Sequence, residues 1–302
     1  MLMKIWMCLL LTLTSITLIK AQDAGDKDVT ENGWANTGKF QFLFNQSAFN
    51  ADWTGGGTSS IAGSLAVDVD LVYTEDRIAW ENSISAEYGL TIQEDERFTR
   101  KTNDRIELNS VVGYEVREND DTAYYSFFIN AMTQATKGYV YSKNDDGEVT
   151  RTERTNMFSP GYFQAGPGFL YKKNKMLTLN VAPSTARLIL VDDMFTSGED
   201  YEDGSYFGVD AGETKRYELG ASINAMYKFK IMDNITMDNK LLIYSNYLDK
   251  PGNVDINYAT NINMKVNDYI SAKLIFQAIY DDNAVGAFQI REVSGLGLNY
   301  TL

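Results

Sequence analysis

The sequence predicts an all-β fold: a transmembrane, antiparallel, up-and-down β-barrel of about twelve strands. Two features lead to this prediction. Apolar and polar residues alternate in long runs from residue 38 to residue 302, and aromatic residues gather on the apolar positions near both ends of these runs. Strict alternation is the period of a half-buried strand. Two aromatic girdles flanking an apolar band are typical of barrels that cross an outer membrane.

The first 21 residues are interpreted as a cleaved signal peptide. Lys4 supplies a positive start, an apolar run extends from Cys8 to Ile19, and Ala21 is the small residue after which cleavage is expected. The run is short for a membrane-spanning helix, and no stop-transfer pattern follows it. Together with the barrel pattern, the signal predicts the outer membrane of a Gram-negative bacterium.

Residues 22–37 are polar, acidic and without a pattern, so we expect a flexible periplasmic lead-in before a barrel domain at 38–302. The pattern is clearest from Tyr217 to Lys230, where the odd positions are all apolar and the even positions almost all polar. A helix cannot produce a period of two. Runs of this kind predict strands near 38–47, 60–73, 77–91, 104–117, 122–136, 159–172, 175–191, 214–231, 235–248, 253–266, 269–281 and 287–302.

The expected connections alternate in length. Tight polar turns, such as Thr74 to Asp76, alternate with mostly longer links at 48–59, 92–103, 137–158, 192–213, 249–252 and 282–286. Outer-membrane barrels have short periplasmic turns and longer external loops. An even number of strands then brings both termini to the periplasmic side. Gly166, Pro167 and Gly168, and Pro183 with Ser184, lie within expected strands and predict kinks or bulges there.

The aromatic positions favour lipid outside the barrel. One expected girdle contains Tyr73, Trp80, Tyr114, Tyr125, Tyr171, Tyr227 and Tyr300, and the other contains Tyr88, Tyr217, Tyr247, Tyr258, Tyr280 and Phe288. A soluble secreted barrel that binds a ligand is the competing fold, and it would point these aromatics into a narrow lumen. The C-terminal alternation of Leu296, Leu298, Tyr300 and Leu302 resembles the assembly signal of outer-membrane proteins, although such signals more often end in Phe.

The composition excludes several functions. The chain has no histidine, and its one cysteine, Cys8, lies in the expected signal peptide. A Ser-His or Asp-His catalytic site therefore cannot form, and we predict no enzyme activity and no cofactor. The formal charge of −14 does not provide the basic surface that binding to nucleic acid requires.

Lipid is the expected partner of the barrel, together with other envelope proteins at the external loops, and we expect a monomer.

The polar face is expected to line the lumen. Its charged members include Asp68, Asp70, Glu81, Glu87, Arg105, Glu107, Glu115, Arg187, Glu218, Lys228, Asp238, Lys240, Lys265, Lys273 and Arg291. These residues would tune a passive pore for small solutes, which is the leading function. The alternative is a barrel plugged by its own ion pairs, with a structural or partner-binding role, because twelve strands fall between filled and open barrels.

One loop is a weak candidate for Ca²⁺. Its carboxylates are Asp192, Asp193, Glu199, Asp200, Glu202 and Asp203. Calcium takes several oxygen ligands, but the spacing is not that of an EF-hand, and a solvated acidic loop is the favoured interpretation. We therefore predict no metal site.

Several segments resemble the DUF3078 family. They are Phe49 to Tyr73, Phe98 to Ser110, Phe207 to Ala221, Ser245 to Asp282 and Val293 to Tyr300. The resemblance covers nearly the whole expected mature chain and implies an outer-membrane barrel from the Bacteroidetes. It supplies no activity and no functional residues, because the family is uncharacterised.

Overall fold

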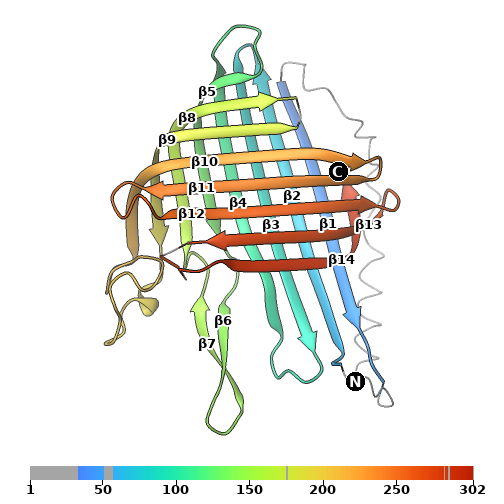
Figure 1. The fold of residues 1–302 in the computed structure, drawn as a ribbon, viewed down its shortest axis with the longest axis vertical. Coiled ribbons are helices and arrows are strands. Elements are labelled where there is room, and N and C mark those ends of the chain that lie inside the picture. Colours follow the sequence, from blue (N-terminus) through green and yellow to red (C-terminus); the bar gives the residue numbers. More distant parts are fainter. Residues whose placement is uncertain (1–32, 51–56, 175, 282, 285, 302) are drawn as a thin grey trace.

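The computed structural model describes residues 33–50, 57–174, 176–281, 283–284 and 286–301. Within these residues, twelve strands form one closed antiparallel barrel, as predicted (Figure 1). The barrel strands are β1 (Gly33–Ser47), β2 (Ser60–Glu75), β3 (Ile78–Gln93), β4 (Arg100–Glu115), β5 (Ala123–Thr133), β8 (Gly161–Lys173), β9 (Leu177–Leu190), β10 (Lys215–Met232), β11 (Ile235–Asn246), β12 (Val254–Lys265), β13 (Ile270–Tyr280) and β14 (Gln289–Thr301).

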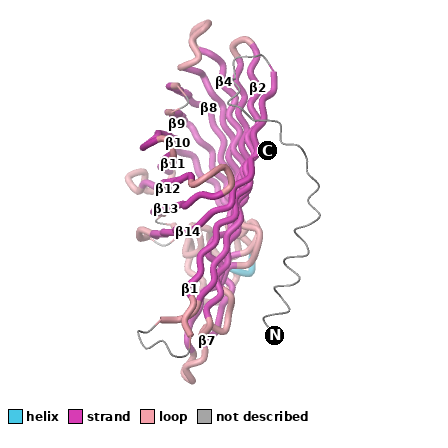
Figure 2. Tube along the Cα trace, turned by 90° about the vertical axis from the view of Figure 1, so that its right-hand side faces the viewer, coloured by secondary structure: helices cyan, strands magenta, loops and turns pink. Residues whose placement is uncertain are grey.

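Each barrel strand pairs with the next one along the chain, and β1 pairs with β14 to close the sheet. The closing register runs from Lys39 opposite Thr301 to Phe44 opposite Leu296. In Figure 1, β10 to β14 cross in front of β1 to β4, because strands that tilt around a barrel run in different directions on its two walls. Figure 2 shows from the side that strands make up most of the described part of the chain.

The first strand begins earlier than predicted. Strand β1 starts at Gly33, so residues 33–37 of the expected lead-in belong to the barrel. Asn36 and Gly38 occupy outward positions and hide the alternation, but the backbone pairs with β2 as far as Thr74. The Trp34 ring also packs on Tyr73, with ring centroids 5.1 Å apart. The predicted signal peptide and residues 22–32 of the lead-in lie outside the described residues.

A hairpin inside one loop was also missed. The predicted link at 137–158 contains β6 (Gly138–Lys143) and β7 (Val149–Thr155), which pair with each other as a separate two-stranded sheet. These strands are too short to be recognised by alternation. Their turn is closed by Asn144, whose side chain accepts from the Glu148 N–H at 2.7 Å, and by Gly147 at a φ of 79°.

The exterior of the barrel is apolar. Phe40, Phe42 and Phe44 of β1 are exposed on alternate positions, as are most of the residues of both expected aromatic girdles. Those girdle residues are Trp80, Tyr114, Tyr125, Tyr171, Tyr227 and Tyr300, and Tyr88, Tyr217, Tyr247 and Phe288. Such a surface is typical of a barrel embedded in lipid. No helix in the described residues is long and apolar enough to cross a membrane.

The wall is distorted between β8 and β9, as the glycine and proline pattern predicted. The register shifts between Ala165 and Phe169 on β8. Here the β9 backbone lies against glycines: a Cβ on Gly166 would lie 2.2 Å from the Ser184 carbonyl oxygen, and one on Gly168 would lie 2.7 Å from that of Val181. Glycine is required because no larger side chain fits between the two backbones.

We expect Gly166→Ala to impair barrel folding, because its methyl group would displace backbone rather than a flexible side chain. The measurement is the heat-modifiable gel shift of refolded protein together with the urea midpoint in detergent. Gly198→Ala is the matched control, since its Cβ would meet no atom within 4 Å, and it should fold normally. Equal folding of the two variants would contradict the close approach.

Candidate functional site

The barrel interior is the candidate site. The strand registers place all fifteen charged residues predicted for the lumen on the face opposite the apolar exterior. Asp68 and Asp70 lie on β2, Glu81 and Glu87 on β3, Arg105, Glu107 and Glu115 on β4, Arg187 on β9, Glu218 and Lys228 on β10, Asp238 and Lys240 on β11, Lys265 on β12, Lys273 on β13 and Arg291 on β14.

The charges are segregated around the barrel. We name Asp68, Asp70, Glu81, Glu87, Glu107 and Glu115, on β2 to β4, the acidic wall, and Lys228, Lys240, Lys265, Lys273 and Arg291, on β10 to β14, the basic wall. Five strands separate β2 from β10 in either direction, so these two strands lie opposite each other. Each wall also has inward residues of the other sign: Arg105 on the acidic side, and Glu218, Asp238 and Asp255 on the basic side.

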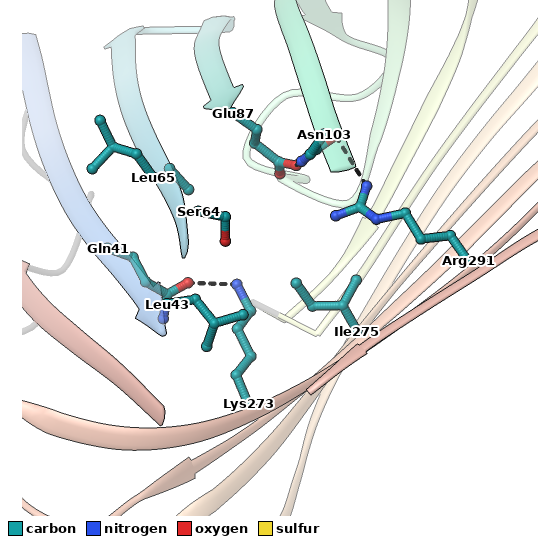
Figure 3. Close-up of a pocket in the computed structure, with 10 residues that line it drawn as sticks. Gln41, Leu43, Ser64, Leu65, Glu87, Asn103, Lys273, Ile275 and Arg291 are labelled. Atoms are coloured by element: carbon teal, nitrogen blue, oxygen red, sulfur yellow. Dashed lines mark hydrogen bonds between the residues drawn. The ribbon is translucent and has the colours of Figure 1, made fainter. Parts of the chain in front are cut away.

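Three residues, Glu87, Asn103 and Arg291, form a bridge across part of the lumen (Figure 3). The Arg291 guanidinium donates to Asn103 Oδ1 at 3.0 Å, and the Asn103 amide donates in turn to the Glu87 carboxylate. Beside the bridge, Lys273 Nζ donates to Gln41 Oε1 at 2.5 Å. These side chains line a half-open cavity of about 20 Å³, which has room for about one water molecule.

The interior is more open toward the short turns. Asp70, Lys228 and Lys240 point inward, yet all three are exposed to solvent. Among the described residues, none of the three side chains has a hydrogen-bond or ion-pair partner. The Asp70 carboxylate nevertheless interacts electrostatically with Lys228 and Lys240, so the opposite walls influence each other here.

Near the long loops, the inward charges are already paired. Arg187 is 5% exposed and donates to Asp255 at 2.5 Å and to Glu218 at 3.4 Å, and its guanidinium lies 3.5 Å from the centre of the Tyr244 ring. Arg216 donates to the same Glu218 at 2.7 Å. Such a buried network holds β9 to β12 together, and its charges are satisfied by one another.

The acidic loop 191–214 packs over the loop end of the barrel. Val191, Tyr206 and Val209 bury against Ile189 of β9, and Phe207 meets the Tyr162 ring edge-on at 6.3 Å. Two carboxylates of the calcium candidate accept local hydrogen bonds: Asp192 accepts from the Met194 N–H at 3.0 Å, and Asp203 accepts from the Ala211 N–H at 2.8 Å. The described residues contain no group of three acidic, cysteine or histidine side chains arranged to hold a metal.

Sequence reasoning missed Gln41 and Asn103 in the lumen. Both are uncharged, and Asn103 precedes the predicted start of its strand at residue 104. Its position could have been recognised by extending the alternation of Arg105, Glu107 and Asn109 by one step. The bulge between Gly89 and Leu90 on the neighbouring strand ends the regular pattern at this point.

Asp281 follows β13 directly, outside the membrane-spanning strand. Burial, followed by the nearby Asp255 carboxylate, raises the pKa of Asp281 to about 6. The guanidinium of Arg187 and the backbone N–H groups of Asn283 and Ala284, at 3.0 and 3.1 Å, oppose this rise in pKa.

Comparisons with known proteins agree with the sequence resemblance. Residues 44–139 match the model of the DUF3078 family, described as a protein of unknown function, which bears out the resemblance over that segment. No curated protein matches the chain.

Similar solved structures include the translocator domain of the autotransporter NalP from Neisseria meningitidis, at 10% identity and a TM-score of 0.42, covering 90% of both chains. The COG4313 outer-membrane channel from Pseudomonas putida F1 has 11% identity and a TM-score of 0.39, covering 93% of this chain and 98% of that one. Outer membrane phospholipase A from Escherichia coli has 10% identity and a TM-score of 0.36, covering 87% and 92%.

Asp281→Asn should make stability less sensitive to pH. The carboxyl of Asp281 has a pKa of about 6 when folded and an ordinary value near 3.8 when unfolded, so the folded state loses stability as pH rises between these values. The loss reaches at most about 3 kcal/mol above pH 6. We expect the variant to exceed the wild type in stability at pH 8 and to differ little at pH 4, measured by denaturant unfolding in detergent.

Asp120→Asn is the control, because the pKa of Asp120 is shifted in the opposite direction from that of Asp281. Hydrogen bonds from Thr122 lower the pKa of Asp120, which lies in a turn, so its removal should not stabilise the protein at pH 8. Parallel pH profiles for Asp281→Asn and the wild type would contradict the raised pKa.

Proposed function

We propose that this DUF3078 barrel is an outer-membrane channel for the passive diffusion of small polar solutes. The observation that carries the proposal is the set of inward, exposed and unpaired charges at Asp70, Lys228 and Lys240. Charges buried in a filled core need ion-pair or hydrogen-bond partners, because desolvation is costly. Charges without such partners are instead stabilised by water, so this section of the lumen is hydrated.

The bridge of Glu87, Asn103 and Arg291 forms the constriction of the proposed channel. Every residue that lines the adjacent cavity belongs to a barrel strand, so side chains alone narrow the lumen at this level. Arg291 is held at its tip by a single hydrogen bond to a neutral oxygen, and its Nε has no partner. A net hydrogen bond that involves one charged group contributes only about 2 kcal/mol, so the Arg291 side chain can swing aside.

A structural or partner-binding barrel is the second candidate. Two observations favour it. The side chains at the bridge leave only a small cavity, and the paired network around Arg187 occupies part of the interior. The docked loop 191–214 would then be the surface for an envelope partner. A soluble binding protein is disfavoured by the exposed aromatic girdles. Because the sequence contains no histidine, the chain cannot form the Ser-His or Asp-His catalytic site of a hydrolase.

We expect the detergent-refolded barrel to give discrete conductance steps in planar bilayers, and Arg291→Ala to enlarge them roughly twofold or more by removing the constriction. Arg151→Ala is the matched control, because Arg151 stacks on Tyr139 of the β6–β7 hairpin, outside the barrel wall. Heat-modifiable gel mobility confirms folding in each case. A folded barrel that stays silent with and without Arg291 would rule out the channel and leave the structural barrel.

A further inference from the structure

We propose that the lumen contains a binding site for small zwitterions, such as amino acids and short peptides, which lie across it between the acidic and basic walls. This inference rests on the proposed channel and names its class of solute. The site is formed by Asp68 and Asp70 on β2 and by Lys228 and Lys240 on β10 and β11. A bound solute would direct its ammonium group toward the aspartates and its carboxylate toward the lysines.

The strand order supplies the first argument. Asp68 and Asp70 stand two residues apart on β2, so both point inward at adjacent levels. Lys228 is on β10, the strand directly opposite β2, and Lys240 is on the neighbouring β11. The two pairs of like charges therefore face each other across the width of the lumen.

The charges on the two walls also interact. The Asp70 carboxylate interacts with both Lys228 and Lys240, and Lys240 interacts as well with Glu107 of the acidic wall. Nearer the bridge, Lys273 interacts with Asp68 and Glu87. In each case, an acidic residue of β2 to β4 lies within electrostatic range of a basic residue of β10 to β14.

The four side chains are also free to bind a solute. None of them has a hydrogen-bond or ion-pair partner among the described residues, unlike Glu81 with Lys172, or Glu107 with Arg105. Asp238 faces inward beside Lys228 in the register, without an ion pair between them. One carboxylate among two lysines leaves that side positive. On the other side, Lys39 of β1 lies opposite Asp68 in the register, and one lysine beside two aspartates leaves that side negative. The two sides therefore keep opposite signs.

The arrangement favours zwitterions for a simple electrostatic reason. A simple cation is attracted by the aspartates and repelled by the lysines, and for an anion the signs are reversed, so the two interactions oppose each other. A zwitterion that lies across the lumen satisfies both sides at once, and water is displaced at both ends. Complementary charge of this kind gives specificity and orients the solute.

The test compares four small probes: glycylglycine as the zwitterion, N-acetylglycine as the anion, glycinamide as the cation and N-acetylglycinamide as the neutral analogue. Equilibrium binding to the folded barrel in detergent is followed by saturation-transfer NMR, and permeation by uptake into proteoliposomes. We expect glycylglycine to bind more tightly and enter faster than the other three. Asp70→Asn and Lys228→Gln should each weaken glycylglycine binding about fivefold, the effect of losing one partly solvated charge contact.

The control variant is Lys230→Gln. Lys230 lies two residues beyond Lys228 on the same strand, but its Nζ is paired with Asp233 at 2.9 Å in the turn. This variant should bind glycylglycine as the wild type does. A merely non-specific effect of removing positive charge would weaken Lys230→Gln and Lys228→Gln equally, and that result would overturn the proposed site.

Ion selectivity gives an independent readout. The double variant Lys228→Gln/Lys240→Gln should shift the reversal potential in a KCl gradient toward cations, and Asp68→Asn/Asp70→Asn should shift it toward anions. Conductance that persists with no preference for glycylglycine in binding or uptake would overturn the site and leave the channel intact. A folded barrel without conductance would refute the channel, and absence of glycylglycine binding to that barrel would also refute the site.

Discussion

The pairing of β1 with β14 is the interaction on which the rest of the structure depends. In lipid, a sheet edge would leave backbone N–H and C=O groups without partners, at a cost of several kcal/mol each, and closure removes both edges. The register from Lys39–Thr301 to Phe44–Leu296 joins residues separated by almost the whole chain. Once the sheet is closed, each strand has one face outside and one face inside the barrel. The apolar residues then face lipid, and the charged residues are enclosed together.

Enclosure creates two kinds of interior charge. Around Arg187, closely packed strands bring carboxylates and an aromatic ring into direct contact, and the resulting network is part of the wall. Around Asp70 and Lys228, the opposite charges lie on facing strands, too far apart to form an ion pair. Both arrangements come from the same alternating pattern, and they differ only in how near the neighbouring inward side chains are.

The sequence predicts which face of the sheet a residue lies on, but not which interior charges come into contact. A period of two assigns a residue to one face, and the registers place the fifteen charged residues on the face opposite the apolar exterior; that these residues line an open lumen stays a prediction. The pattern failed where outward positions are not apolar, as at Asn36 and Gly38, and where strands are short, as in the β6–β7 hairpin. It also cannot pair residues across the lumen. The contact of Arg291 with Asn103 joins strands four places apart, and it depends on the stagger of the closed sheet rather than on either local sequence.

Net charge is a poor guide to the interior of this barrel. The chain is strongly acidic, but much of that charge lies in loops and turns, as in the carboxylates between Asp192 and Glu213, whereas the two walls of the lumen oppose each other in sign. At the bridge, Glu87 of β3 is joined through Asn103 to Arg291 of β14, only three strands away, whereas nearer the turns Asp70 of β2 and Lys228 of β10 lie on opposite strands. The direction from acidic to basic side chains therefore differs between the two levels, and it is determined by the strand order of the closed sheet and not by the net charge of the chain.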